Sequence, residues 1–338
     1  MSGISSAQHI VQQLCAPLAS SANTLLIQLI LYKSPKTLGV YKYLMIYISL
    51  FEILYAVIDV LAAADFYSYD SVFLVIVRTD KALLPVWTLK VLCNLLCSLF
   101  GVSMVTFAIH FVYRYLVVTG NPFLKSNSVS NVSVWFVAPV VYGIVWSNVV
   151  TFTLDPNEFT DDILGKHYLQ KHSLSLDNMT YYGMNYFVPG ENGSEEFNWK
   201  VMGGTAVIMI MVSASILTIV TFATLSYRKM GVLVDASSNS KHYRTLQLEL
   251  LNSLVAQALI PILLMQGPSC IIFTAPLFHQ GTELLGGILG ITIALYPVLD
   301  PFPTMFIIKH YRNALLKPCR RAGRKNGKSS IPVISNLT

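Results

Sequence analysis

Long apolar runs are the feature that most constrains how this chain can fold. The clearest of them extends from Val91 to Val118 and contains no Lys, Arg, Asp or Glu before Arg114. At about 1.5 Å per residue, a helix of this length exceeds the roughly 30 Å hydrocarbon core of a bilayer. The run therefore predicts a membrane-spanning helix.

The composition of the whole chain agrees with a membrane protein. Hydrophobic residues make up 54% of the 338 residues and charged residues 12%, about half the charged share of a soluble domain. A soluble fold of this size could not bury so much apolar surface. We therefore expect a polytopic membrane protein, in which the net charge of +6 is no sign of nucleic-acid binding.

Polar segments divide the chain into seven such runs. They predict an all-α membrane protein, a seven-transmembrane helix bundle over residues 1–315, followed by a basic tail at 316–338. The expected spans lie at about 10–32, 43–64, 91–118, 132–154, 201–227, 250–273 and 284–308. The short apolar run Val72–Val77 cannot cross a bilayer as a helix, so we expect it in a loop outside the membrane.

The basic residues predict which side of the membrane each end occupies. An odd number of spans puts the two termini on opposite sides. Seventeen of the 23 Lys and Arg residues fall on the side of the tail, and six fall on the other side. The positive-inside rule then predicts an amino terminus outside the cell and a tail in the cytoplasm.

Acceptor sequences for N-glycosylation agree with this orientation in part. Asn178-Met-Thr180 and Asn192-Gly-Ser194 lie in the long polar loop that the topology places outside, so we expect glycans on Asn178 and Asn192. Two further sequons, at Asn131 and Asn336, fall on the cytoplasmic side and are expected to stay bare.

The polar residues show no pattern typical of catalysis. The sequence has no recognisable nucleophile–base pair, phosphate-binding loop or metal-ligand cluster, so we expect no enzyme activity, no cofactor and no metal. Cys93 and Cys97 share a helix face, but with no His or acid nearby they favour core packing over metal binding. Cys319 lies in the basic tail shortly after the last span, a usual place for palmitoylation, with a free thiol as the alternative.

Several motifs along the chain resemble one receptor family. They are Gly39-Val-Tyr-Lys-Tyr-Leu-Met45, His110-Phe-Val-Tyr-Arg-Tyr115, Gln257 with Ile260-Pro261, Leu295-Tyr-Pro-Val-Leu-Asp-Pro301, and Tyr311-Arg312. Together they are similar to those of nematode seven-transmembrane chemoreceptors of the str class. The resemblance implies a G-protein-coupled odorant receptor in the plasma membrane of a sensory cilium. Its implied partners are a small organic ligand, a heterotrimeric G protein and the lipid bilayer.

The same resemblance implies a set of switch or coupling residues. These are His110, Arg114, Tyr115, Tyr296, Asp300 and Pro301. Arg114 closes the third span, where such receptors keep a switch arginine, although the acid that usually precedes it is replaced by Tyr113. The alternatives are that Arg114 reaches phospholipid headgroups and that His110 is a packed core histidine. Asp300, at a proline-broken helix, is expected to be part of a hinge.

A ligand is expected among the outer halves of spans three, five, six and seven. On span three, one approximate helix stripe supplies the candidate ligand-binding residues Cys93, Cys97, Phe100, Gly101 and Met104. Asp59 is added because it is an acid within span two, on its outer half, and acids inside a membrane are costly. The alternative for the stripe is ordinary helix packing, and for Asp59 a buried structural acid.

A transporter or ligand-gated channel is the rival interpretation. In that case Glu52, Asp59 and Asp300 would line a polar path through the membrane. Transporters usually contain paired repeats with matching broken helices, whereas prolines here break spans six and seven only. The sequence therefore favours a receptor.

Overall fold

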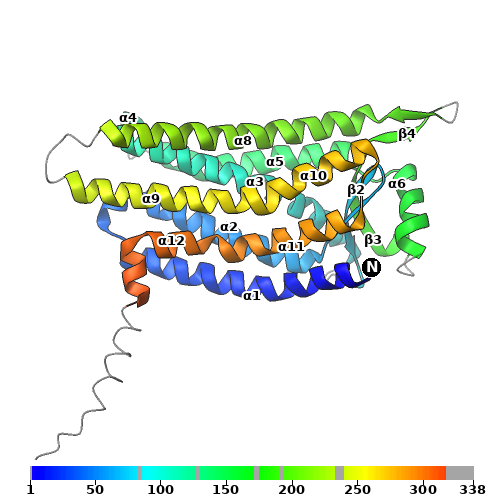
Figure 1. The fold of residues 1–338 in the computed structure, drawn as a ribbon, viewed down its shortest axis with the longest axis horizontal. Helices are drawn as coiled ribbons and strands as arrows, with labels where there is room; N and C mark the ends of the chain where they lie inside the picture. Colours follow the sequence, from blue (N-terminus) through cyan, green and yellow to red (C-terminus); the bar gives the residue numbers. More distant parts are fainter. Residues whose placement is uncertain are drawn as a thin grey trace, which may run out of the picture.

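A bundle of long antiparallel helices dominates the computed structural model (Figure 1). The structure describes residues 2–81, 85–125, 129–170, 175–190, 194–232 and 240–316. Within these ranges, seven helices are long and apolar enough to cross a membrane. The expected seven-helix fold is thereby confirmed.

The first five spans are single helices, and the last two are interrupted. Spans one to five are α1 (Ser2–Lys33), α2 (Tyr41–Ala62), α3 (Val86–Thr119), α5 (Val129–Thr153) and α8 (Trp199–Val232). Span six consists of α9 (Ser240–Pro261), a π-helical turn η5 (Ile262–Gln266) and α10 (Gly267–Thr274). Span seven consists of α11 (Glu283–Leu299) and α12 (Pro301–Ile307). Short turns join them, namely η1 (Lys36–Leu38), α4 (Pro122–Lys125), α6 (Glu158–Ile163), η2 (Leu164–Leu169), η3 (Leu176–Asn178) and η6 (Ala275–Phe278).

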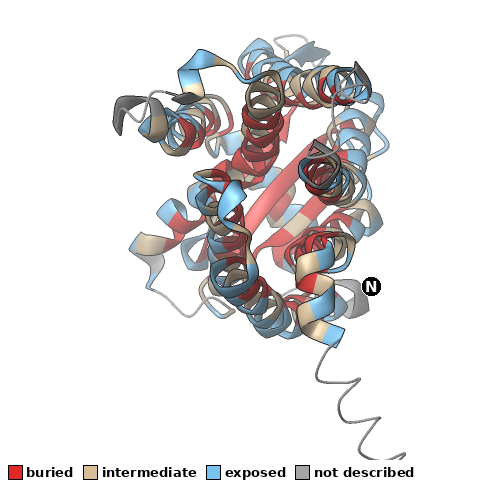
Figure 2. Cartoon of the chain, turned by 90° about the vertical axis from the view of Figure 1, so that its left-hand side faces the viewer, coloured by how far each residue is buried: buried red, intermediate tan, exposed pale blue. Residues whose placement is uncertain are grey.

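Helix α3 is the central helix of the bundle. Its apolar window is 72% buried, more than that of any other span in the described part of the chain. Gly101 lets α5 approach closely, because a Cβ atom at this position would collide with the Trp146 ring. Seen along the bundle, the buried residues face this centre and the exposed ones face outward (Figure 2). The outward residues are largely apolar, as a lipid-facing surface requires.

A three-stranded antiparallel sheet covers one end of the bundle. It is formed by β1 (Asp65–Tyr69), β2 (Val72–Arg78) and β3 (Met179–Asn185), in the order β1-β2-β3. We call it the cap sheet, and its end of the molecule the sheet end. A separate hairpin, β4 (Phe187–Pro189) with β5 (Glu195–Phe197), lies beside it. The opposite end, with α4 and the loop between α1 and α2, is the basic end.

The cap sheet corrects the expectation that Val72–Val77 lies in a loop. Every residue of β2 is buried. Phe73, Val75 and Val77 face the main core of the bundle, whereas Leu74 and Ile76 pack into a second core beneath α6 and η2. A strand buried on both faces needs no apolar–polar alternation. The run therefore lacked the period of two that would have predicted a strand.

Candidate functional site

A partly open cavity lies between the cap sheet and the bundle. Its volume is about 60 Å³, and Phe66, Phe73, Val75 and Met184 of the cap sheet form its roof. Its other walls come from α2, α3, α5, α8, α10 and α11. The remaining lining residues are Tyr55, Leu96, Cys97, Phe100, Trp146, Val150, Leu154, Ile208, Ser269, Phe273, Leu289 and Ile293. Because none of them is charged, the cavity suits an uncharged, mainly apolar molecule.

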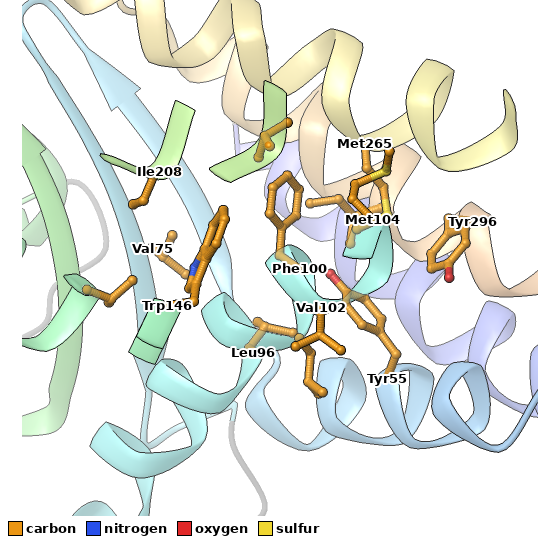
Figure 3. Close-up of a cluster of buried hydrophobic side chains, with 14 of the residues drawn as sticks. Tyr55, Val75, Leu96, Phe100, Val102, Met104, Trp146, Ile208, Met265 and Tyr296 are labelled. Atoms are coloured by element: carbon orange, nitrogen blue, oxygen red, sulfur yellow. The ribbon is translucent and has the colours of Figure 1, made fainter. Parts of the chain in front are cut away.

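Two of the five residues predicted on α3 line this cavity. They are Cys97 and Phe100, whose ring lies 6.2 Å from that of Trp146. Cys93 instead lies against β2, with its Sγ 3.6 Å from the carbonyl oxygen of Val75. Gly101 packs on Trp146, and Met104 lies deeper in the core, next to Met265 (Figure 3). Of the predicted stripe, two residues therefore line the cavity and three take part in packing between elements.

Asp59 lies outside the cavity lining, at the contact between α1 and α2. Its side chain is 3% exposed, and its Oδ1 accepts a hydrogen bond of 3.1 Å from Nε2 of Gln12. This geometry fits a buried acid that joins two helices. A role of Asp59 in ligand recognition stays a prediction.

Sequence reasoning missed most of the cavity. Trp146 and Val150 come from α5, Ile208 from α8 and Phe273 from α10, and none of them belongs to a motif. The cap residues were missed because no strand was predicted. Of these residues, only Trp146 could have been singled out from the sequence, because it is the one tryptophan in the outer half of span four.

A buried charge cluster fastens the cap sheet to α1. Asp65, at the start of β1, accepts hydrogen bonds from Ser5 at 2.8 Å, and His9 Nε2 lies 2.9 Å from its Oδ1. Lys81 Nζ lies 3.1 Å from Asp65 Oδ2, and the Tyr168 hydroxyl donates to the same oxygen at 2.7 Å. The cluster therefore joins three segments that are distant in sequence.

The charge of Asp65 is held firmly in this cluster. Burial of Asp65 raises its pKa, but the hydrogen bond with His9 and the charge of Lys81 outweigh burial. Their sum places the pKa of Asp65 well below its usual range. The carboxylate is therefore ionised at any pH near neutral, and the cluster stays intact there.

A second polar cluster lies at the break between α11 and α12. Gln257 Nε2 donates to the Oδ2 of Asp300 at 2.7 Å and to its backbone carbonyl at 3.1 Å. Thr304 donates to Gln257 Oε1 at 2.7 Å. Pro301 has no N–H for the carbonyl of Pro297, and Asn23 of α1 donates to that carbonyl instead, at 3.1 Å. The expected proline break is present and is bridged by side chains from two other helices.

Glu52 and Tyr296 belong to the same cluster. Glu52 is 1% exposed and interacts with Asp300, Asn23 and Tyr296. The Tyr296 ring, 0% exposed, packs edge-on against Tyr55, with 6.0 Å between the centroids. Since Tyr55 lines the cavity, these rings connect the cavity to the polar cluster by direct contact.

Arg114 lies inside the bundle towards the basic end and is 2% exposed. Its Nη2 donates to the backbone carbonyl of Gln247 in α9 at 3.0 Å. Its guanidinium carbon lies 4.8 Å from the ring centroid of Tyr41 in α2. Tyr113, which replaces the usual acid, stacks on the same ring at 5.6 Å. Arg114 therefore joins α3 to α2 and α9 and does not extend to lipid headgroups.

Two other predicted switch residues, His110 and Tyr115, lie near Arg114 on α3, whereas Tyr296, Asp300 and Pro301 belong to the cluster at the α11–α12 break. His110 is 2% exposed and packs edge-on against Tyr41 at 5.8 Å. Tyr115 contacts Phe222 of α8 at 5.3 Å. The roles of these residues in coupling stay predictions.

The predicted modification sites are only partly within the described residues. Asn178 is exposed, at the end of η3 and at the sheet end. Asn192 and Cys319 lie outside the described residues.

Two larger hollows are weaker candidates for a ligand site. One, of about 650 Å³, is an open polar cleft lined by residues such as Asp155, Glu158 and Lys200 at the sheet end. The other, of about 460 Å³, is a groove between α2, α3 and α5 that includes the outward-facing residues Leu54 and Ile144. The first has charged residues in its lining, and the second lies partly on the outward surface of the helices, whereas the lining of the cavity beneath the cap sheet is uncharged and comes from six spans and the cap sheet.

The fold and these clusters define a class, the seven-helix membrane receptors. The structure resembles that of squid rhodopsin with a TM-score of 0.61 over 98% of this chain and 93% of that chain, at 11% sequence identity. That likeness concerns the fold alone.

The family follows from sequence comparison. Residues 8–316 match the model of the family described as serpentine type 7TM GPCR chemoreceptor Str, and the chain belongs to this family. It is 31% identical to the G-protein coupled receptor str-217 of Caenorhabditis elegans, over 92% of this chain and 89% of that protein. It is 28% identical to the serpentine receptor class r-10 of Caenorhabditis briggsae, over 83% of this chain and 82% of that protein.

Proposed function

We propose that this receptor detects a small organic odorant bound in the cavity beneath the cap sheet and signals to a heterotrimeric G protein at the basic end. The observation that carries the proposal is the uncharged cavity, which is lined by residues from spans two to seven and roofed by the cap sheet. Its volume of about 60 Å³ is below that of the roughly 150 Å³ cavity known to hold benzene. The ligand is therefore small, or side chains move to admit it.

The sheet end faces the outside in this proposal, and the basic end faces the cytoplasm. The positive-inside rule supports this orientation, as does the exposed acceptor Asn178 at the sheet end. We further propose that the receptor carries glycans on Asn178 and Asn192 and an acyl chain on Cys319. Its proposed location is the plasma membrane of a sensory cilium.

Coupling depends on a resting lock around Arg114. In related switches the arginine pairs with an acid, whereas here it is held by the Gln247 carbonyl and the Tyr41 ring. Release of these two contacts would let α9 move away from α3 at the basic end. The Tyr55–Tyr296 contact and the polar cluster around Asp300 provide a connected path from the cavity towards this end.

A transport function has less support. Asp59 bonds to Gln12 between α1 and α2, whereas Glu52 and Asp300 belong to the cluster at the α11–α12 break. None of the three lines the cavity. Family membership also favours a receptor.

The test is to reconstitute the full chain in vesicles with a heterotrimeric G protein and to screen small volatile compounds. The proposal predicts that at least one compound accelerates nucleotide exchange without producing ion or solute flux. Flux without nucleotide exchange would contradict it and support the transporter.

A further inference from the structure

Ser269 is the polar residue of the cavity that packing does not explain. It lies on α10, lines the cavity and is 2% exposed. Tyr55, Cys97 and Trp146 also carry polar side-chain atoms. Among the lining residues, however, only Ser269 has a buried side-chain oxygen without a hydrogen-bond partner in the described part of the chain.

Among the described residues of the spans, four buried serine or threonine hydroxyls have no hydrogen-bond partner, and Ser269 is the one of them that lines the cavity; the others are Ser49, Thr205 and Ser226. Helical serines and threonines normally donate to the carbonyl four residues earlier. Ser98 does so to Asn94 at 2.8 Å, and Thr274, one turn beyond Ser269 on the same helix, does so to Cys270 at 2.7 Å. Ser269 makes no such bond. A buried hydroxyl left without a partner is destabilising, so its presence at the cavity wall calls for an explanation.

The local backbone accounts for the missing bond. The residue four positions before Ser269 is Met265, which lies in the π-helical turn η5 (Ile262–Gln266). Carbonyls in a π turn bond to residues five positions later, so the usual partner geometry is lost. Pro261 and Pro268 flank this turn and prevent a regular helix there. The same wide turn sets the rotation of α10 that brings Ser269 to the cavity wall.

We propose that Ser269 is the polar anchor of the cavity and donates a hydrogen bond to a single acceptor oxygen of the ligand. The inference depends on the proposed function, because it assumes that the cavity beneath the cap sheet is the ligand site. The ligand class that fits is a small, uncharged, mainly apolar molecule with one hydrogen-bond acceptor. Charged ligands are excluded, because no lining residue could pair with a buried charge.

A pair of shape-matched probes tests this assignment. Tetrahydrofuran and cyclopentane have nearly the same size, but only tetrahydrofuran carries an acceptor oxygen. Binding of each probe to the purified full-length receptor in nanodiscs is measured from the ligand-induced rise in unfolding midpoint at a series of free concentrations. Cyclopentane has no polar atom to desolvate, so the informative quantity is the ratio of tetrahydrofuran affinity to cyclopentane affinity in each receptor. A net hydrogen bond is worth about 3- to 10-fold in affinity, so this ratio should be higher in the wild type than in a receptor without the Ser269 hydroxyl by about that factor.

Three variants separate a direct contact from a general effect on packing. Ser269→Ala should lower the affinity ratio by about 3- to 10-fold by weakening tetrahydrofuran binding, with cyclopentane unchanged or tighter. Ser269→Thr keeps a hydroxyl and should retain the wild-type ratio. Ser103→Ala is the matched control, since Ser103 is buried, donates to the Phe100 carbonyl at 2.7 Å and does not line the cavity.

The outcomes distinguish failure of the inference from failure of the proposed function. If both probes bind and Ser269→Ala has the same affinity ratio as the wild type, the role of Ser269 is wrong while the cavity stays a ligand site. If neither probe stabilises the wild-type receptor at millimolar concentration, the cavity is not a site for such molecules. In that case both proposals are contradicted.

Discussion

Arg114 shows how a single buried charge is accommodated inside a membrane bundle. A guanidinium in hydrocarbon is costly unless its donors are satisfied. Here one donor reaches the Gln247 carbonyl, and the face of the cation lies on the Tyr41 ring. A cation–π contact contributes about 0.5–2 kcal/mol, and a hydrogen bond from a charged donor about 1.5–3 kcal/mol. Both contacts depend on the positions of α2 and α9, so movement of either helix weakens them.

Substitution of Arg114 should separate binding from coupling. Arg114→Ala removes the group that joins α3 to α9, and we expect ligand binding to persist while ligand-stimulated nucleotide exchange falls by at least about tenfold. Lys36→Ala is the control, because it removes an exposed basic residue at the same end. Tyr41→Leu, which removes the ring that Arg114, Tyr113 and His110 contact but keeps the hydrogen bond of Arg114 to Gln247, should raise exchange without ligand. Loss of binding in Arg114→Ala at normal surface expression would show that the arginine has a different role.

Asp59 offers a residue-scale test of ligand recognition. Asparagine is nearly isosteric and can still accept the hydrogen bond from Gln12, so packing of α1 on α2 should survive in Asp59→Asn. Because Asp59 does not line the cavity, we expect the ranking of several volatile compounds to match that of the wild type, normalised to surface level. A changed ranking would support the ligand-binding role that the sequence suggested.

At the scale of elements, the cap sheet forms one wall of the cavity. It is attached at several points besides the Asp65 cluster. The backbones of Asp70 and Gly281 exchange two hydrogen bonds of 3.1 and 2.9 Å, which join the β1–β2 turn to the loop before α11. Gly286 of α11 lets β1 approach so closely that a Cβ atom there would collide with the Phe66 carbonyl. Ligand exchange therefore requires motion of this sheet or of the side chains around it.

Loss of the Asp65 charge should loosen the cap sheet. Asp65→Asn removes the counter-charge of Lys81, whereas Arg78 keeps its pair with Asp80, and breaking a buried pair in this way costs about 3–5 kcal/mol. We expect faster hydrogen exchange at the β2 amides. Asp162→Asn is the matched control, since the Asp162–Lys166 pair is exposed and worth little. Unchanged exchange in Asp65→Asn would show that the cluster does not hold the sheet.

The pKa of Asp65 fixes the pH dependence of the same contact. Because the folded-state pKa is lowered, the stabilisation is present above the ordinary carboxyl range near 4 and is lost only as the pH falls through the lowered value. Protection of the β2 amides, corrected for intrinsic exchange, should therefore be level between about pH 5 and pH 8.

At the scale of the whole molecule, orientation in the membrane is open to a direct test. Asn178 and Asn192 should carry glycans that an endoglycosidase removes, and an antibody to residues 317–338 should stain only permeabilised cells. Asn178→Gln and Asn192→Gln should each remove one glycan. Staining of the tail on intact cells would reverse the orientation.

The helices were predictable because the bilayer imposes their length and polarity. The five uninterrupted apolar runs correspond to α1, α2, α3, α5 and α8. The two runs with proline breaks correspond to α9–α10 and α11–α12. The cap sheet was not predictable in the same way, since β2 is apolar on both faces and β3 lies more than 100 residues further along the chain. Pairing between such distant segments leaves no local pattern.

The site was predictable only on the central helix. Phe100 and Cys97 were found because α3 contributes to the interior in any such bundle, but a stripe of one helix cannot tell cavity from packing. Ser269 was missed because its position at the cavity wall depends on the π turn η5. The prolines around this turn change the helix geometry locally, and a hydrophobic periodicity does not reveal such a change. The partners of Arg114, Gln247 and Tyr41, come from helices whose rotation the sequence does not specify.

The central claim, that the cavity beneath the cap sheet is the ligand site, is tested most directly by filling it. Val150 of α5 lines the cavity and is 2% exposed, whereas Val145 on the same helix is 47% exposed and lies outside the lining. For a compound that activates the wild-type receptor, we measure ligand-stimulated nucleotide exchange in Val150→Phe and Val145→Phe at matched surface expression. The account predicts that Val150→Phe abolishes the response while Val145→Phe retains it. An undiminished response in Val150→Phe, with the same concentration dependence as the wild type, would contradict the account.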